Sequence, residues 1–574
     1  MKRSIFIFVA TAFIIFAFPL FARGEVEATG DTAAAQGGPQ YGGTFTWAYT
    51  ATATAGPGNA DMTTGNWYSY WYSSPFSEWL VIGDFEKYGP RGTNEFAFES
   101  ASAVDEPYLK GGLAESWELS AGKIVFHIRQ GVMWAGREGV MDPREFTAHD
   151  AAFHLKRWLA GSAGKGTSPE GWVESIAATD NYTLVVETST YNPMWFYLTG
   201  YGPGLGIIPE EVVKADATDW MNSVGTGPFM VTDYVEGSYM TYEKNPNWWD
   251  KTHVIDGKEY DLPFIDKMVW PIIPDEGTQV ASLRTGKIDA MSSIKRDYEE
   301  TLADTSPELV KKKLSSRGVT QYAFNTAIEP WNNPEVRRAF MIGTDFQAIY
   351  DALYPGANLY DFPVVKDSPG VYPEWDELPE STQMLFDYNP TLAARMLRDE
   401  GIPEGFEMEL MIVSEGASPM IKEMWEKLGV KVNIKVVEQA AQFNVIWTEG
   451  HAGHNGVVAA GSGQDFPYRV LQRYGSWHIY NYPNYIDDHA AELYAKASAM
   501  DITPAERNAI MKEQAKYLLD QAICVPISGT YSLYYWWPWV KNFHGEINVG
   551  YVSPGPILAT VWLDQDMKAE MGYK

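Results

Sequence analysis

Short runs in which apolar and polar residues alternate, separated by turn residues, fill the stretch from 224 to 291. Residues 229–234 alternate as a half-buried strand does, the pair Glu236-Gly237 suits a hairpin turn, and residues 239–244 read as the returning strand. Residues 268–273 alternate again. The pattern therefore predicts an antiparallel hairpin followed by a third strand.

Helix starts are marked by capping residues. A side-chain oxygen just before a helix accepts a hydrogen bond from a free backbone N–H group, and proline suits the first helical position. Such starts occur at Asp275, Asn333-Pro334, Asn389-Pro390 and Thr503-Pro504, the last with Glu506 in place for a capping box. Strands and helices mix without regular alternation, so the predicted class is mixed α/β to α+β.

The chain has 574 residues and a net charge of −30. Because a domain has on the order of 150 residues, two or more domains are expected. The negative charge argues against nucleic acid or an anionic membrane surface as a partner, since both would repel the protein. Such a charge also favours solubility.

The amino-terminal residues have the pattern of an export signal. Two basic residues precede an apolar run over residues 5–21, which predicts a signal peptide at residues 1–22. Cleavage is expected after Ala22 or Gly24, and residues 23–40 are expected to be a flexible lead-in. A membrane anchor is the alternative, because the run is marginal in length for a span. No cysteine lies just after the run, where a lipoprotein would need one, so we expect a soluble periplasmic protein and not a lipoprotein.

Residues that would carry catalysis or bind a metal lack the required sequence setting. The only cysteine, Cys524, lies in an apolar stretch and is predicted to be a buried thiol. Residues 161–167 are rich in glycine but lack the spacing of a phosphate-binding loop. His451 and His454 have no third metal ligand near them in the sequence. We therefore expect no enzyme, no metal and no cofactor.

Tryptophan and tyrosine, with 22 and 34 residues, gather in groups. The groups lie at residues 67–72, 248–249, 474–485 and 534–539. Aromatic rings supply flat apolar surface with a polar edge, which suits sugar rings or varied side chains of a ligand. The alternative is that these rings pack the core and the boundaries between domains.

Several sequence boxes follow one another in an order that resembles a known family. They read YGGTF at 41–45, LAESWE at 113–118, FTAHD at 146–150, GTGPF at 225–229, NPNWW at 245–249, LRTGKIDA at 283–290 and FNT at 324–326. One box alone is a weak signal, but together they extend over nearly the whole chain. The chain resembles the family 5 extracellular solute-binding proteins, which are the dipeptide, oligopeptide, nickel and oligosaccharide receptors of ABC importers.

The resemblance implies a hinged periplasmic binding protein fold of two lobes with an extra inserted domain. Lobe I is expected to combine residues 41–83, 224–315 and 541–574, lobe II to be the insertion at 84–223, and lobe III to comprise 316–540. The hinge is expected at two chain crossings, near residues 317–322 and 531–540. Lobes of this kind close over a ligand.

Peptide-binding members of the family carry an aspartate that pairs with the α-amino group of the peptide, close to a tryptophan. An ungapped match places Gly463 and Ala460 at these two positions, and Asp465 can take the place of the aspartate only after a gap. A buried ammonium without a partner is costly, so this departure favours a neutral ligand such as an oligosaccharide. The frequency of ligands in the family favours a peptide.

The candidate ligand-binding residues come from the aromatic groups and from the family boxes. They are Asn66, Trp67, Tyr68, Trp71, Asn325, Ser462, Asp465, Trp477, Tyr534 and Trp536. The resemblance implies a monomer that captures an oligopeptide, or alternatively an oligosaccharide, and delivers it to the permease of an ABC transporter. A secreted glycan hydrolase is a remote alternative.

Overall fold

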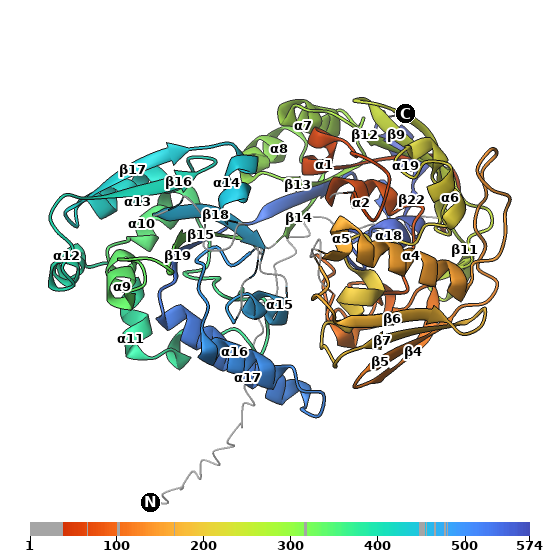
Figure 1. The fold of residues 1–574 in the computed structure, drawn as a ribbon. Coiled ribbons are helices and arrows are strands. Elements are labelled where there is room, and N and C mark those ends of the chain that lie inside the picture. Colours follow the sequence, from red (N-terminus) through yellow and green to blue (C-terminus); the bar gives the residue numbers. More distant parts are fainter. Residues whose placement is uncertain are drawn as a thin grey trace, which may run out of the picture.

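The computed structural model describes residues 38–65, 67–99, 104–165, 167–314, 318–446, 454, 456–463, 466–475, 478 and 480–573. These residues form three units, each built on its own β-sheet of seven, four or five strands. Figure 1 shows the five-stranded and four-stranded units on opposite sides of the molecule, with β13 (Ala290–Ile294) and β14 (Val310–Leu314) between them. The seven-stranded unit thus joins the other two.

The seven-stranded sheet has the strand order β14-β20-β13-β1-β12-β9-β8. Its other strands are β1 (Thr44–Tyr49), β8 (Phe229–Val235), β9 (Tyr239–Lys244), β12 (Lys267–Pro271) and β20 (Ser532–Trp536). Strand β1 runs parallel to both of its neighbours. Its Phe45 and Trp47 are each 1% exposed, because a central strand is covered on both faces.

Helices and two short strand pairs complete the seven-stranded unit. They are α1 (Thr50–Ala55), α2 (Trp67–Ser73), α7 (Glu276–Arg284), α8 (Glu299–Thr305), α18 (Gly555–Ala559), α19 (Gln565–Glu570), β10 (Thr252–Ile255) with β11 (Lys258–Asp261), and β21 (Val540–Lys541) with β22 (Trp562–Leu563). This unit therefore draws on three separate parts of the chain, including its last residues.

The four-stranded sheet, of order β4-β5-β7-β6, lies in the region predicted as lobe II. Its strands are β4 (Ala114–Ser120), β5 (Lys123–Ile128), β6 (Val173–Ala178) and β7 (Thr183–Thr188), with α4 (Ala148–Ala160), α5 (Ser162–Lys165), α6 (Glu210–Lys214) and the π-helical segment η2 (Phe196–Tyr201). Two strands, β2 (Val81–Gly83) and β3 (Leu109–Gly111), form a separate antiparallel pair, and α3 (Phe85–Tyr88) follows β2.

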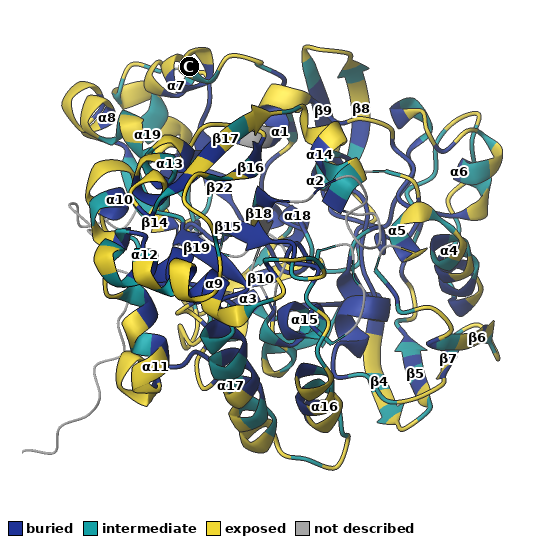
Figure 2. Ribbon diagram, turned by 60° about the vertical axis from the view of Figure 1, so that its left-hand side comes forward, coloured by how far each residue is buried: buried dark blue, intermediate teal, exposed yellow. Residues whose placement is uncertain are grey.

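The five-stranded sheet has the order β17-β16-β18-β15-β19. Its strands are β15 (Gly318–Phe324), β16 (Phe406–Ile412), β17 (Val430–Val436), β18 (Val457–Gly463) and β19 (Cys524–Ser528). Its helices are α9 (Pro334–Ile342), α10 (Phe346–Leu353), α11 (Glu380–Gln383), α12 (Pro390–Asp399), α13 (Ser418–Glu426), α14 (Gln439–Ile446), α15 (Pro467–Gln472), α16 (Asp488–Ala497) and α17 (Pro504–Asp520). Figure 2 shows the buried strands of this sheet beneath more exposed helices.

The five-stranded unit has a hydrophobic core of its own, whose buried residues all lie between positions 322 and 527. Phe324 and Trp331 stack with ring centres 5.3 Å apart, and the ring of Phe340 meets that of Trp425 edge-on at 4.9 Å. Such aromatic pairs add to the free energy gained by burial. The unit can therefore keep its internal packing if it moves as a body.

Local sequence signals predicted many of these elements. Strand β9 has the predicted bounds, and β12 begins and ends within two residues of the prediction. The Asn333 side chain accepts a hydrogen bond from the backbone N–H of Glu335, as expected of a cap. Thr503 and Glu506 form the predicted capping box at the start of α17. Cys524 is buried in β19, and burial raises the pKa of its thiol.

The chain passes between the seven-stranded and five-stranded units at two points. The first crossing, from β14 to β15, falls at residues 315–317, which lie outside the described residues. The second runs through residues 529–531, between β19 and β20. Because β20 pairs with both β13 and β14, residues 532–536 belong with the first sheet, although the predicted boundary of lobe III was residue 540. The boundary at residue 540 came from the family resemblance, whereas β20 already lies beyond the second crossing.

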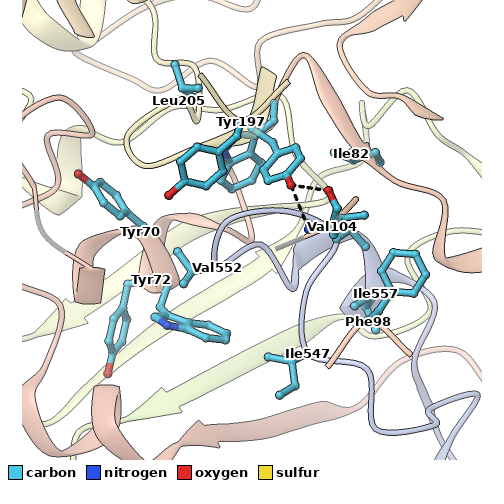
Figure 3. Packing of buried hydrophobic residues seen from close by; sticks show 14 of the residues in the cluster. Tyr70, Tyr72, Ile82, Phe98, Val104, Tyr197, Leu205, Ile547, Val552 and Ile557 are labelled. Atoms are coloured by element: carbon cyan, nitrogen blue, oxygen red, sulfur yellow. Dashed lines mark hydrogen bonds between the residues drawn. The ribbon is translucent and has the colours of Figure 1, made fainter. Parts of the chain in front are cut away.

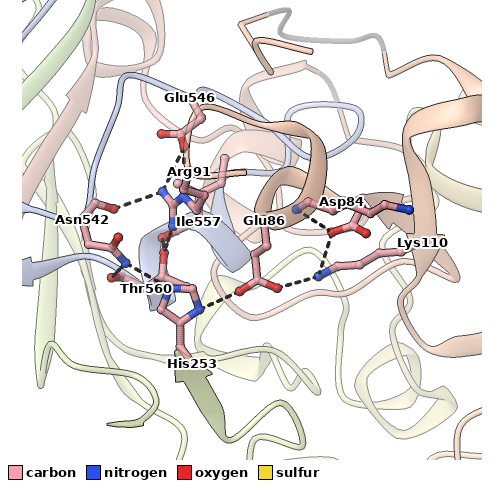
Figure 4. Close-up of polar contacts among 10 residues, drawn as sticks. Asp84, Glu86, Arg91, Lys110, His253, Asn542, Glu546, Ile557 and Thr560 are labelled. Atoms are coloured by element: carbon pink, nitrogen blue, oxygen red, sulfur yellow. Dashed lines mark hydrogen bonds and ion pairs between the residues drawn. The ribbon is translucent and has the colours of Figure 1, made fainter. Parts of the chain in front are cut away.

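Buried charges fasten the four-stranded side to the end of the chain (Figure 4). The Arg91 guanidinium donates to Glu546 at 3.0 Å, to the hydroxyl of Thr560 at 2.8 Å and to the carbonyl of Asn542 at 3.0 Å. The side chains of Arg91 and Glu546 are 8% and 0% exposed. A pair so deeply buried is costly to break, because the remaining charge stays without a partner.

A second link in Figure 4 joins α3 to β10. The Glu86 carboxylate lies 2.7 Å from Nδ1 of His253 and 3.0 Å from Nζ of Lys110. Nearby, Glu78 is buried and accepts hydrogen bonds from the indoles of Trp248 and Trp249 at 3.0 to 3.1 Å. The contact between Glu86 and His253 thus holds α3 against β10, and Glu78 anchors the two tryptophans within the first unit.

Within the residues that the structure describes, no helix is both long enough and apolar enough to cross a membrane. The predicted signal peptide at residues 1–22 and most of the lead-in lie outside those residues.

Candidate functional site

The predicted aromatic group at residues 67–72 forms α2, directly behind the end of β1. Tyr49 stacks on Trp71 with ring centres 4.4 Å apart, and Trp67 meets both rings edge-on at 5.5 and 5.8 Å. Trp71 is 0% exposed, whereas Trp67 and Tyr68 are half-buried. We call Tyr49, Trp67, Tyr68 and Trp71 the aromatic platform. Trp71 supports the platform from below, and the half-buried rings of Trp67 and Tyr68 are its available surface.

One polar group of the platform has no partner within the described residues. The indole N–H of Trp71 is buried, and no hydrogen-bond acceptor lies near it there. A buried donor of this kind costs free energy until an acceptor reaches it. Because this N–H group is buried, the platform presents apolar ring faces at its surface.

The two candidate residues on β20 lie in the core. The Tyr534 hydroxyl accepts a hydrogen bond from the indole N–H of Trp47, and burial raises the pKa of Tyr534. Trp536 is 7% exposed and packs against Phe543 with ring centres 5.1 Å apart. In this arrangement both residues support the sheet behind the platform.

Of the remaining candidates, Asn325 makes a contact inside the fold, and the side chains of the others lie outside the described residues. Asn325 is 1% exposed, and its amide donates to the backbone carbonyl of His454 at 2.8 Å. The Ser462 backbone pairs with Val319 in the five-stranded sheet, but its side chain is outside the described residues. Three further candidates also lie outside them, namely Asn66, Asp465 and Trp477.

Sequence reasoning missed the contacts through which the five-stranded and four-stranded units meet. Arg469 of α15 donates to the hydroxyl of Tyr197 in η2 at 2.7 Å, and its guanidinium lies 4.9 Å from the centre of that ring. Phe466 meets the rings of Tyr197 and Phe196 at 5.4 and 6.1 Å. We call this contact the interlobe junction.

The junction leads to the platform through buried tyrosines. Tyr551 lies between Tyr197 and Tyr70, with ring centres 6.1 and 5.9 Å away, and Tyr70 belongs to α2. Figure 3 shows Tyr70 and Tyr197 among the buried residues of this region. The aromatic-rich run at 191–201 was the only sequence signal that could have indicated Tyr197.

The five-stranded side of the junction also carries buried nitrogen bases. Burial lowers the pKa of Arg473, and the nearby Arg469 lowers it further. Burial, followed by the charges of Arg473 and Arg469, lowers the pKa of His478 to about 3, so this imidazole is neutral at neutral pH. Arg473 also lies over the ring of Tyr480 at 5.5 Å. The region thus combines positive charge with aromatic rings, in a chain that is strongly acidic as a whole.

The arrangement is suited to binding. Among the described residues, no group of three or more His, Cys, Asp or Glu side chains is placed to hold a metal ion. His454, one of the two histidines considered as metal ligands, lies 3.8 Å from a carboxylate oxygen of Glu409. The other, His451, is outside the described residues.

Comparison with solved structures supports the fold. The model superposes on the ABC transporter-associated periplasmic binding protein DppA from Helicobacter pylori, solved with the peptide STSA, with a TM-score of 0.69 and 21% identity. This match covers 92% of the present chain and 99% of that chain. CtaP from Listeria monocytogenes, an ABC transporter substrate-binding protein, gives a TM-score of 0.70 with 17% identity over 91% and 100% of the two chains. The predicted mixed α/β, two-lobed fold is confirmed.

Sequence comparison gives the family. The chain is 28% identical over 374 residues to Heme-binding protein A of Haemophilus influenzae, covering 60% of this chain and 64% of that protein. It is 26% identical over 359 residues to the dipeptide-binding protein of Escherichia coli, covering 57% and 63%. It thus spans slightly less than two thirds of these relatives. The model of the bacterial extracellular solute-binding proteins, family 5 middle region, matches residues 109–478. The chain therefore belongs to the family 5 bacterial extracellular solute-binding proteins.

Proposed function

We propose that this protein is the periplasmic substrate-binding component of an ABC importer and that it binds an oligopeptide between its lobes. The observation that carries the proposal is the interlobe junction, where Arg469 and Phe466 meet Tyr197 across two units. Family membership supports binding as the activity. The relatives named for dipeptides and the structure solved with a peptide support the ligand class.

The proposed mechanism is closure about the two chain crossings. The five-stranded unit has its own core and is joined to the first sheet through residues 315–317 and 529–531. A ligand that contacts both sides stabilises the closed arrangement by its differential affinity for that state. In the closed arrangement α15 contacts η2 through the hydrogen bond from Arg469 to Tyr197, and opening would break this contact. The closed protein would then deliver the ligand to the permease.

An oligosaccharide is the second candidate ligand. Trp67 and Tyr68 present half-buried rings, which can stack on sugar rings without a charged anchor. The proposed aspartate anchor, Asp465, is one of the residues that are not described, so its role stays a prediction. The two ligand classes therefore differ in whether an aromatic face or a carboxylate dominates the affinity.

A thermal-shift screen tests the proposal directly. The mature protein is heated with peptide and oligosaccharide libraries, and hemin is included because one relative is named for heme. A ligand that binds only the folded protein raises the melting temperature by mass action. A peptide that raises it supports the proposal. The absence of any shift across the peptides, with a shift from a sugar, would replace the proposal by the second candidate.

Calorimetry on three variants separates the two modes of binding. For a stacked neutral ligand, Trp67→Ala should weaken binding by about 1–3 kcal/mol, whereas Asp465→Ala should change little. For a peptide held by its amino group, Asp465→Ala should cost about 2 kcal/mol or more, and N-acetylated peptides should not bind. Trp375→Ala serves as the control, since this tryptophan of the five-stranded unit is 43% exposed and is not one of the candidate site residues. Wild-type affinity in both site variants would mean that the site lies elsewhere.

Export is tested by the mass of the purified mature protein. We expect an N-terminus between Arg23 and Glu27 that carries no lipid, because a basic and apolar leader precedes it and no cysteine follows. An acylated or uncleaved N-terminus would contradict the predicted export as a soluble periplasmic protein.

A further inference from the structure

A polar pocket lies away from the interlobe junction, where the end of β5 meets the loop after β9. Its volume is about 550 Å³, and its lining includes Glu115, Arg129, Gln130, Asn247, Trp249 and Lys251. The first three residues come from the four-stranded side, and the last three come from the segment between β9 and β10. We call it the peripheral pocket.

Arg129 is held in one orientation at this pocket. Its guanidinium lies 4.2 Å from the centre of the Trp249 ring, and its Nε donates to the carbonyl of Gly112 at 3.0 Å. Among the contacts of the described residues, its two terminal amino groups donate to no acceptor. A planar guanidinium fixed in this way can bind a carboxylate through two parallel hydrogen bonds.

Trp249 is a rigid wall because its indole is anchored from behind. Its Nε1 donates to both carboxylate oxygens of the buried Glu78, at 3.1 and 3.0 Å. The ring therefore does not need to be ordered when a ligand arrives, and less conformational entropy is lost on binding. Its face offers apolar contact beside the Arg129 guanidinium.

Two charges of opposite sign complete the pocket. Lys251 and Glu115 are both exposed, and within the described part of the chain neither forms an ion pair. A third charge, that of Asp250, lies near Arg129 in the same loop as Lys251 and is half-buried. The lining itself thus has Arg129 and the carboxylate of Glu115 on the four-stranded side and Lys251 on the facing segment.

We propose that the peripheral pocket is a second solute site that takes a small zwitterion, such as a free amino acid, with its carboxylate on Arg129 and Lys251 and its ammonium on Glu115. An apolar side chain would lie against Trp249. A zwitterion suits this protein better than a plain anion, because the chain carries a net charge of −30 that repels anions. The site is independent of the function proposed for the junction.

Equilibrium dialysis with radiolabelled L-leucine tests this assignment on the full mature protein. Lys251→Gln, Arg129→Gln and Glu115→Gln should each weaken binding roughly tenfold, the size expected for losing one charge-assisted hydrogen bond. Lys251 and Glu115 are exposed, so their variants should fold normally even if Arg129→Gln does not. Arg395→Gln, an exposed arginine on α12, is the matched control and should bind as the wild type does.

Two analogues test recognition of both charges. N-acetyl-leucine lacks the ammonium and leucinamide lacks the carboxylate, so each should bind roughly tenfold more weakly than leucine. No binding of leucine at millimolar concentration would overturn the proposal, as would wild-type binding by all three pocket variants. Equal binding of N-acetyl-leucine and leucine would also overturn it.

The same variants distinguish this site from the junction. Peptide affinity measured by calorimetry should be unchanged in Lys251→Gln and Glu115→Gln, because neither residue lies at the junction. Loss of peptide binding together with leucine binding would mean that both ligands share one site, and the peripheral assignment would be wrong. If the wild type binds no peptide, the proposed function fails, and the leucine measurements alone decide whether the peripheral pocket is a solute site.

Discussion

The contacts that hold the four-stranded side in place differ in kind from those that hold the five-stranded unit. The boundary with the four-stranded side is held by the buried pair Arg91 and Glu546 and by the partly exposed contact of Glu86 with His253. The five-stranded unit is joined to the seven-stranded unit by two chain crossings. Within the described residues it meets the four-stranded side through rings and polar contacts such as the hydrogen bond from Arg469 to Tyr197. Buried charges are costly to separate, whereas opening the junction parts uncharged rings, whose apolar contacts a ligand can replace. We therefore expect the first boundary to stay fixed and the second to be the one that opens.

The largest expected effect comes from breaking the fixed boundary. Arg91→Met should lower the free energy of unfolding by about 3–5 kcal/mol, because Glu546 would remain buried without its partner. Urea denaturation measures this difference. Lys214→Met is the control, since its partner Glu210 is 53% exposed and such a surface pair contributes about 0–1 kcal/mol. Equal losses in the two variants would remove the contrast between the boundaries.

The second effect depends on pH and concerns Glu78, which supports Trp248 and Trp249 at the same boundary. Burial raises the pKa of Glu78 to about 7, against an unfolded value of 4.5. The unfolded state therefore loses its proton first, and wild-type stability falls as pH rises from 4.5 to 7. Glu78→Gln mimics the neutral acid and should be more stable than the wild type by on the order of 2–3 kcal/mol near pH 8.

Thermal melts across this pH range check the Glu78 prediction. The two proteins should be nearly equal in stability well below pH 4.5, where the wild-type carboxyl is neutral in both states. The exposed Glu404→Gln provides the comparison and should show no such dependence. A difference that is the same at both ends of the range would rule out the titration of Glu78 as its cause.

The third effect concerns the interlobe junction, where the five-stranded unit meets the four-stranded side. Tyr197→Phe removes the hydroxyl that accepts from Arg469 and should destabilise the closed arrangement by about 0.5–1.5 kcal/mol, the usual net worth of one hydrogen bond. Small-angle scattering of the ligand-free protein should then give a larger radius of gyration. The melting temperature should change little, because the open protein is still folded. Tyr388→Phe, on the exposed surface, should change neither quantity.

The smallest effect concerns Glu86 at low pH. Burial raises the pKa of this carboxyl, but hydrogen bonds from His253 and Lys110 outweigh burial and hold the pKa at about 2. A lowered carboxyl pKa stabilises the fold above pH 4.5, and that stability is lost as pH falls from 4.5 toward 2. Because the side chain is 37% exposed, Glu86→Gln should cost under about 1 kcal/mol at neutral pH. The cost should vanish near pH 2 in acid-dependent melts, and a constant cost would contradict the assignment.

The contrast between the boundaries also explains what the sequence could predict. Strand β9 and the caps at Asn333 and Thr503 rest on neighbouring residues, so local pattern and turn chemistry were enough. The contact between Tyr197 and Arg469 joins residues 272 positions apart, and no local signal pairs the aromatic run that contains Tyr197 with Arg469. A group of aromatic residues likewise does not reveal which ring is covered. Trp71 became the buried support and Trp67 the accessible face only through packing against β1.

The same limit applies to β20. Its aromatic residues suggested contact with a ligand, yet Tyr534 is tied to Trp47 and Trp536 to Phe543 inside the first unit. Periodicity gives the strand but not the sheet in which it pairs, because both sheets offer apolar faces. The assignment of β20 needed the register with β13 and β14.

The place of β20 has a consequence for the order in which the chain is made. The five-stranded unit begins and ends on neighbouring strands, with the Gly529 backbone donating to Gly318 at 3.0 Å, so its two ends are already together when it folds. The first sheet instead waits for partners synthesised last, as the bond from Trp539 to Asp289 spans 250 positions. At bacterial synthesis rates that interval lasts roughly 12–50 s. During this interval β13 and β14 lack β20, the strand that pairs with both. A chaperone or another chain can bind their unpaired edges before the sheet is complete.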